Sequence, residues 1–305
     1  MLSEDHIHSN NADDQPEMGR RFWLICRYLC ISLAIIFLLL CISVLSLRWV
    51  NPSFTTFTLL ENWQSIEAER YNLRDWWVSG DQLPEHLKWA VIASEDQLFM
   101  DHRGFDTESI RKVMEQRGDG GRVRGASTIS QQVVKNLYLW PAQSYIRKGI
   151  EAGITILIEL FLPKERILEI YLNIAEFGPG VFGAGKAAHD YFGLSAEQLN
   201  PRMSAQLAVV LPSPKRMQVA SPGPYATERI EWVLTQMTQL TGNRYRPMVE
   251  PDTTRSDILT PFPDELYPID YDEDYFPDFE TDSTRIPAEP DSVLHPVEPD
   301  TVDSN

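Results

Sequence analysis

Cysteine is scarce in this chain of 305 residues. The three cysteines, Cys26, Cys30 and Cys41, lie in or beside one apolar run near the N-terminus. Because no cysteine follows Cys41, the remainder cannot form an intrachain disulfide, and a disulfide-stapled scaffold is excluded. The rest of the chain must be held by a hydrophobic core, for which its length is ample.

Basic residues are outnumbered, with 27 Lys and Arg against 44 Asp and Glu and a net charge of −17. A nucleic-acid partner is therefore not expected, since phosphate backbones call for a basic surface. The acidity belongs to the two ends of the chain. Residues 250–305 contain 17 acidic and 2 basic side chains, residues 1–21 contain 5 and 2, and residues 22–249 contain 22 and 23. The middle is nearly neutral and has to be interpreted by itself.

Charge is absent from the twenty residues 28–47. At about 1.5 Å per residue a helix of this length spans the roughly 30 Å hydrocarbon core of a bilayer, and its only polar side chains are serines. A cleaved signal peptide would have a shorter apolar run and a small-residue cleavage site. Arg20, Arg21 and Arg27 precede the run, whereas Arg48 alone follows it closely. This bias predicts a cytoplasmic N-terminus at residues 1–27, with everything after the span outside.

Residues 247–305 contain ten of the 21 prolines among many acidic side chains. Frequent proline and high net charge prevent helix propagation and leave too little apolar surface to offset the entropy of ordering. We expect a disordered acidic tail. Its interspersed tyrosines and phenylalanines leave open a short docking motif.

One folded domain is expected over residues 63–245, and its periodicity is helical. Pro163 ends one predicted helix, and Lys164 begins the next. Strand-type alternation is lacking, which argues against a parallel sheet or a sandwich and favours a mainly α fold. The segments with apolar residues at three- and four-residue steps are EHLKWAVIASEDQLF, STISQQVVKNLYL, YIRKGIEAGITILIELFL, KERILEIYLNIAEFG and SAQLAVVL.

Two adjacent carboxylates, Glu95 and Asp96, lie near the end of the first of these segments. Such a pair is unusual at the end of an apolar helix, because burying charge without a partner is costly. The alternative is a solvated helix end, with His102 pairing Asp101 or Asp106.

Ser127 and Thr128 form a predicted N-cap, behind which backbone N–H donors are exposed. A helix N-terminus with a lysine one or two turns further on suits a phosphate-bearing ligand, although a capped surface helix has the same pattern. The amide and ammonium donors on this helix are Gln131, Gln132, Lys135 and Asn136.

A third group places Glu151 one helical turn from Arg147 and Lys148. On an exposed surface such pairs would stabilise the helix by only about 0.3–0.5 kcal/mol. Since the rest of this helix is almost wholly apolar, we expect the group to border a buried surface, where its cations can meet a phosphate. Residues 103–148 hold nine basic and four acidic side chains, which predicts a cationic groove.

The strings EDQLFMDHRGFD, GASTISQQVVKN, RKGIEAG, ILEIYLNIAEFGPGVFGAGKAAHDYFG and AQLAVVLPSP, between residues 90 and 222, resemble in order the five motifs of the family 51 peptidoglycan glycosyltransferases. No transpeptidase domain follows them, so the chain looks like the monofunctional biosynthetic branch. The resemblance implies a mainly α, lysozyme-like domain beside a single transmembrane helix. It also implies a bacterial inner-membrane protein whose catalytic domain faces the periplasm or the exterior. A docking motif in the tail would be expected to take cell-wall or division proteins as partners.

The reaction that this resemblance implies joins lipid II units onto a growing glycan strand and releases undecaprenyl diphosphate. Glu95 matches the catalytic base and Glu151 the second catalytic glutamate, on the donor side. No protein-bound metal is implied, although a divalent cation (Mg²⁺ or Mn²⁺) at the diphosphate is compatible with the chemistry. The positions that match substrate-binding residues are Asp96, Phe99, Ser127, Gln131, Gln132, Lys135, Asn136, Arg147 and Lys148.

Two positions depart from the family pattern. Gln143 stands where many relatives carry an arginine, a loss for which Arg122 or Arg124 can compensate, and Ala126 replaces a glycine. Two other functions stay open on these residues. One is a lytic enzyme that cleaves peptidoglycan, and the other is a membrane-anchored scaffold without activity.

Overall fold

A computed structural model describes residues 15–59, 72–111, 127–141 and 144–242, and all structural statements concern these ranges. Several sequence predictions lie outside them: the start of the chain at residues 1–14, the acidic tail at 247–305, and the positions Arg122, Arg124, Ala126 and Gln143.

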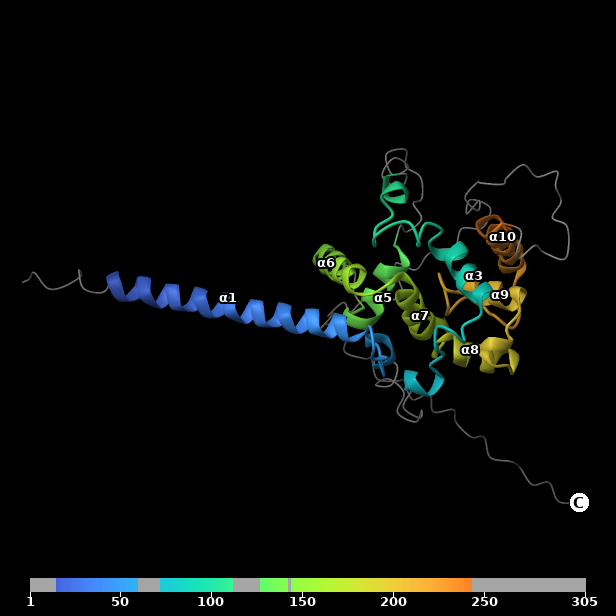
Figure 1. The fold of residues 1–305 in the computed structure, drawn as a ribbon, viewed down its shortest axis with the longest axis horizontal. Helices are drawn as coiled ribbons and strands as arrows, with labels where there is room; N and C mark the ends of the chain where they lie inside the picture. The colour runs from blue at the N-terminus through green and yellow to red at the C-terminus, as the bar shows by residue number, and fades with distance from the viewer. Residues whose placement is uncertain (1–14, 60–71, 112–126, 142–143, 243–305) are drawn as a thin grey trace, which may run out of the picture. The chain divides into compact units, whose positions relative to one another are not determined.

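Helix α1, Gln15–Ser46, contains nearly all of the predicted span and begins earlier than it (Figure 1). Within it, residues 20–46 form a helix long and apolar enough to cross a membrane, the one such helix in the described ranges. Most of its side chains are exposed rather than packed in a core, unlike those of a central helix in a soluble protein.

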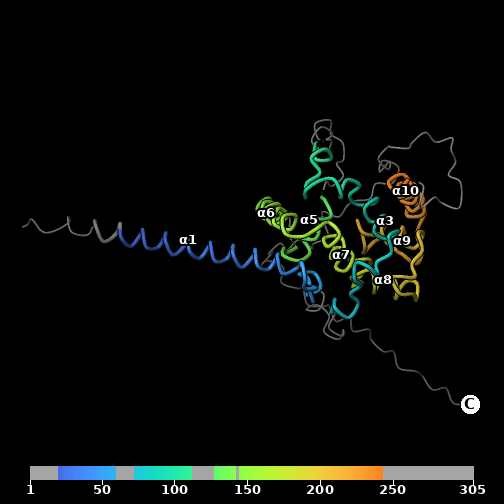
Figure 2. The backbone as a smooth tube through the Cα atoms, viewed as in Figure 1, coloured from blue at the N-terminus to red at the C-terminus, as the bar shows by residue number. Residues whose placement is uncertain are grey.

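The described part of the domain is mainly α, as predicted (Figure 2). Its only strands there are the short antiparallel pair β1, Glu176–Gly178, and β2, Val181–Phe182. Residues 56–59 and 107–111 are helical, and the further helices of the domain are α3 (Glu85–Glu95), α5 (Ile129–Tyr138), α6 (Tyr145–Phe161), α7 (Lys164–Ile174), α8 (Ala184–Phe192), α9 (Pro201–Val210) and α10 (Pro224–Thr241), with the 3₁₀ turns η1 (Leu73–Trp76) and η2 (Ala196–Gln198).

Two groups of helices build the core. Helices α3, α9 and α10 pack against one another, α5 packs against both α6 and α7, and α1 contacts α6 (Figure 1). Fully buried side chains such as Leu87, Val133 and Ile170 fill these contacts. Each buried aliphatic side chain of this size stabilises the fold by about 1.5–3 kcal/mol. Hydrogen bonds between these groups bring the C-terminus of α3, the N-terminus of α5 and the middle of α7 into one region.

Two helices end earlier than their periodicity predicts. Helix α3 stops at Glu95, and Asp96 is extended, with φ −161°, because its side chain bonds to the start of α5. Helix α7 stops at Ile174, after which the chain turns through β1 and β2. Gly183, with φ +84°, closes this turn: a Cβ there would lie 2.8 Å from the carbonyl oxygen of Asn173. In both places contacts from other elements override local helical periodicity.

Candidate functional site

Glu95 is the last residue of α3 and is half-buried. Its Oε2 accepts a hydrogen bond from Nε2 of Gln132 at 2.9 Å. Its Oε1 is buried and has no hydrogen-bond partner among the described residues. A buried carboxylate oxygen normally has a partner, so this atom is available to a group outside the described residues.

Gln132 is held from its other end by Tyr171 of α7, whose hydroxyl donates to the Gln132 Oε1 at 3.0 Å. Tyr171 is 2% exposed. Burial raises the pKa of Tyr171 well above its ordinary value, and the negative charges of Glu95 and Asp96 add to the effect. The phenol therefore stays protonated, and a chain of donors runs from Tyr171 through Gln132 to Glu95.

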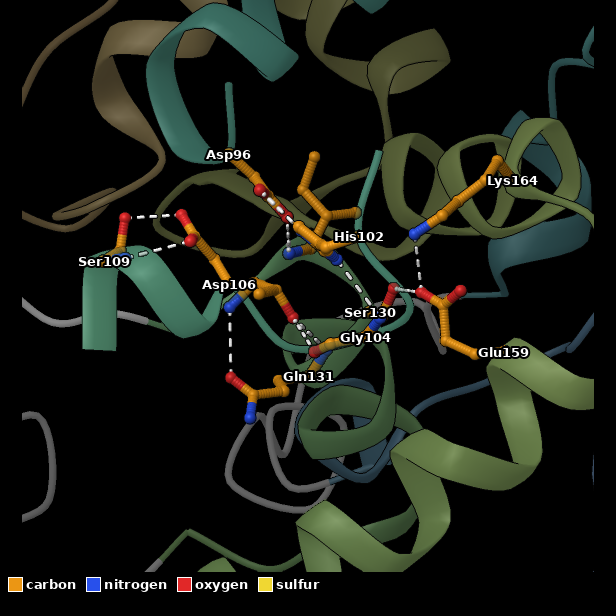
Figure 3. A network of polar contacts seen from close by, with 11 residues as sticks. Asp96, His102, Gly104, Asp106, Ser109, Ser130, Gln131, Glu159 and Lys164 are labelled. Carbon is orange, nitrogen blue, oxygen red and sulfur yellow. Dashed lines mark hydrogen bonds and ion pairs between the residues drawn. The ribbon is translucent and has the colours of Figure 1, made fainter. Parts of the chain in front are cut away.

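Asp96 is buried and paired with His102 (Figure 3). The His102 Nε2 lies 2.9 Å from Oδ1 and 3.1 Å from Oδ2 of Asp96. The backbone N–H of Gly104 donates to Nδ1 at 3.1 Å, so the imidazole hydrogen is on Nε2 and points at the carboxylate. The alternative of a solvated helix end, with His102 paired to Asp101 or Asp106, is therefore wrong.

The N-terminus of α5 is capped as predicted. Thr128 accepts from the backbone N–H of Gln131, and the side-chain oxygen of Gln131 accepts from the backbone N–H of Thr128 at 3.1 Å. The backbone N–H of Ile129 donates to Oδ2 of Asp96 at 3.0 Å. A carboxylate at a helix N-terminus is stabilised by the helix dipole. Asp96 and Gln131 are thus engaged within the protein and join α3 to α5.

Glu151 is 2% exposed on α6 and is surrounded by cations. Arg147 donates to its Oε2 at 3.2 Å, and the ammonium of Lys148 contacts Oε1. Lys148 also donates to the hydroxyl of Ser127 at 3.2 Å, which brings three predicted site residues together. The Arg147 Nε is buried and has no partner in the described ranges. The prediction that this group borders a buried surface is confirmed.

The ammonium of Lys135 interacts electrostatically with both glutamates, Glu95 and Glu151. Its pKa is lowered, chiefly because the ammonium is desolvated. The charges of Glu151 and Glu95 oppose this shift, whereas Arg147 and Lys148 add to it. One ammonium within reach of all four groups shows that the α3 and α6 parts of the predicted site belong to one region.

Phe99 and Asn136 complete the predicted set. Phe99 is fully buried in the core, with the Lys164 ammonium 4.3 Å from its ring centroid. Lys164 is paired with Glu159 at 2.8 Å. Asn136 is half-buried on α5, next to Lys135. Phe99 therefore belongs to the core, and the substrate-binding roles of both residues stay predictions.

Sequence reasoning missed Tyr171 and misplaced His102. Tyr171 falls on the apolar face of the segment KERILEIYLN, and the periodicity of that segment does not single it out. A tyrosine on a buried helix face needs a partner for its hydroxyl, which is a signal that could have found it. The position of the partner, Gln132, depends on the packing of α7 against α5.

Comparisons with known proteins agree with this geometry. A family model described as Transglycosylase matches residues 62–238, more than half of the chain. The chain is 48% identical to the biosynthetic peptidoglycan transglycosylase of Ectopseudomonas mendocina over 211 residues, which cover 68% of this chain and 86% of that protein. It is 49% identical to the protein of the same name from Pseudomonas aeruginosa over 202 residues, covering 65% and 86%. The corresponding protein of Xanthomonas campestris is 47% identical over 207 residues, covering 67% and 84%.

Proposed function

Because the chain belongs to the transglycosylase family, with its lysozyme-like domain, we propose that it is a peptidoglycan glycosyltransferase that polymerises lipid II into glycan strands for the cell wall. The observation that carries the proposal is that the two glutamates lie in different environments. Glu95 presents a carboxylate oxygen without a partner among the described residues, and Glu151 is buried among cations. The first arrangement suits proton removal, and the second suits an anionic leaving group.

In the proposed reaction the 4-hydroxyl of the acceptor sugar gives its proton to Oε1 of Glu95. The acceptor oxygen then bonds to C1 of the growing chain with inversion, and the bond from C1 to the diphosphate oxygen breaks. Undecaprenyl diphosphate leaves with the electron pair of that bond. Gln132 holds Oε2 of Glu95 through its 2.9 Å hydrogen bond, which keeps Oε1 directed at the acceptor.

The leaving diphosphate needs positive charge rather than an acid. A glycosidase must protonate an alkoxide and therefore uses two carboxyl groups as an acid and base or nucleophile pair. Here Glu151 orients Arg147 and Lys148, and Lys135 adds a third cation nearby. The buried Nε–H of Arg147 is a donor for a phosphate oxygen. This charge distribution favours transfer over the lytic alternative.

A divalent cation at the diphosphate stays part of the proposal. Within the described ranges no three or more His, Cys, Asp or Glu side chains gather as a metal site, so such an ion would be held by the diphosphate. Its chemistry would be to neutralise phosphate charge as the bond to C1 breaks. Arg147, Lys148 and Lys135 would share that task.

Helices α1 and α6 support the proposal that the protein is anchored in a membrane. Helix α1 can span a bilayer, and it contacts α6. The face of α6 away from Glu151 exposes apolar side chains, namely Tyr145, Ile146, Ile150, Ile156 and Leu160. An enzyme whose substrate is a lipid benefits from holding its site at the membrane surface. We propose a single-pass protein of the bacterial inner membrane, with its N-terminus in the cytoplasm and its domain outside.

For the acidic tail, residues 247–305, we propose a docking role toward cell-wall or division proteins, supported by its interspersed aromatic residues. The tail lies outside the described residues.

The test is to incubate the detergent-solubilised full chain with lipid II and to separate the products by size. Polymeric glycan with release of undecaprenyl diphosphate is the expected result. Cleavage of finished sacculi without polymerisation would show instead that the protein is a lytic enzyme. Neither activity, in a folded protein that binds lipid II, would favour the scaffold.

A further inference from the structure

We propose that Tyr171 is a positioning residue for the reaction, acting through the Gln132 amide to fix Oε2 of Glu95 and so direct Oε1 at the acceptor hydroxyl. The inference rests on the proposed function. Tyr171 belongs to α7, Gln132 to α5 and Glu95 to α3, so the link joins three helices that meet only in the folded domain.

The direction of every hydrogen bond in this link follows from the chemistry of its ends. An ionised carboxylate only accepts, so the Gln132 amide must turn its NH₂ group toward Glu95. The amide oxygen is then left facing the Tyr171 hydroxyl at 3.0 Å, and that hydroxyl must donate. The phenol can do so at every working pH because burial holds its pKa well above the ordinary value.

The link has a consequence for Glu95 that packing alone would not have. Oε2 is occupied by Gln132, while Oε1 has no partner among the described residues. Without the Tyr171 hydroxyl, the oxygen of Gln132 loses its donor in a part-buried place, and the amide is no longer held against rotation. A rotated amide no longer donates to Oε2, and the carboxylate can turn away from the acceptor.

The test variant is Tyr171→Phe, which removes one hydroxyl and leaves the ring in place. We expect kcat for lipid II polymerisation to fall about 10- to 100-fold, as misplacement of a catalytic group does, with little change in KM. The cations around Glu151 are untouched by the substitution, so substrate binding should persist. The matched control is Tyr191→Phe, whose hydroxyl lies 3.4 Å from the Phe177 carbonyl oxygen, outside this link. Its kcat should equal that of the wild type.

A double-mutant cycle separates positioning from general support of the fold. Gln132→Met should itself lower kcat, and adding Tyr171→Phe to it should lower kcat no further, because Tyr171 acts through Gln132. If the two losses multiply, Tyr171 acts independently of Gln132 and the inference is overturned. Should Tyr171→Phe fail to fold, Gln132→Met alone decides: a fallen kcat at unchanged KM supports the link, and a wild-type kcat overturns it.

The activity of the wild-type chain separates a failure of the proposed function from a failure of the Tyr171 role alone. If it forms no glycan polymer from lipid II, the proposed function fails before any variant is compared. If it polymerises lipid II and Tyr171→Phe does so at the same kcat, only the positioning role of Tyr171 is lost.

Discussion

Arg166 on α7 donates from Nε to the backbone carbonyl of Leu47 at 2.8 Å, which ties the domain to the chain just beyond α1. The same guanidinium donates to the Asn51 side chain at 2.7 Å and to the Val50 carbonyl at 3.3 Å. It is paired in turn with Glu169, at 2.7 Å. One planar cation therefore holds the residues that follow the apolar helix against the domain.

Replacing Arg166 by lysine should destabilise the protein, because an ammonium cannot reproduce the planar set of N–H donors of the guanidinium. For Arg166→Lys we expect the free energy of unfolding to fall by about 1–3 kcal/mol, measured by thermal unfolding of the detergent-solubilised chain. The matched control is Arg202→Lys, whose partner Glu231 is exposed. That variant should stay within about 0.5 kcal/mol of the wild type. Equal stability of the two variants would contradict the bridging role.

Gly185 at the start of α8 approaches the backbone of η1 closely. A Cβ on Gly185 would lie 2.4 Å from the Trp76 carbonyl oxygen, so Gly185→Ala should force the two elements apart and cost about 1–3 kcal/mol. Gly153, inside α6, has nothing within 4 Å of an added Cβ. Gly153→Ala should therefore stabilise the protein by about 0.5–1 kcal/mol. Thermal unfolding of both variants checks the pair, and a Gly185→Ala protein as stable as the wild type would refute the contact.

Features that depend on local chemistry were predictable from the sequence. Pro163 separates α6 from α7 as predicted, because proline has no N–H to continue a helix and fits just before a helix start. Thr128 caps α5 because its side chain satisfies a free N–H nearby. The spacing of Arg147, Lys148 and Glu151 on one helix was sufficient to predict their ion pairs.

Features that depend on packing between distant segments were not predictable. His102 pairs Asp96 rather than Asp101 or Asp106 because α3 ends early and Gly104 orients the imidazole. The hydroxyl of Tyr171 reaches Gln132 across 39 positions of sequence only because α7 packs on α5. Periodicity identifies the buried face of a helix, but it does not identify the partner across the interface.

Removal of the Glu95 charge should stop the reaction without stopping binding. For Glu95→Gln we expect kcat to fall about 100- to 10,000-fold, the usual contribution of a general base, while lipid II still binds. Polymer formation is measured by size separation, and binding by retention of labelled lipid II. The control is Glu85→Gln, an exposed carboxylate in the first turn of the same helix, which should polymerise normally. Substantial polymerisation by Glu95→Gln would remove Glu95 from its role.

The charged form of Lys135 destabilises the folded protein, and the same charge is proposed to stabilise the leaving diphosphate. The folded-state pKa of Lys135 is lowered by burial, so between that value and about 10.4 the unfolded chain binds the extra proton. Stability therefore rises as pH increases through this window, and at neutral pH the charged lysine opposes folding. We expect Lys135→Met to unfold at a temperature equal to or above that of the wild type, and to lose about 100-fold or more in kcat.

The same lowered pKa sets an alkaline limit on activity. As pH rises through the folded-state pKa of Lys135, the ammonium is lost and polymerisation should decline at a pH below about 10.4. Lys135→Arg keeps its charge there, so its alkaline limb should lie at higher pH even if its maximum rate is lower. Lys88→Arg, a lysine paired with Glu85 on α3, is the control and should keep the wild-type profile. An alkaline limb at the same pH in Lys135→Arg and in the wild type would show that another group sets the limit.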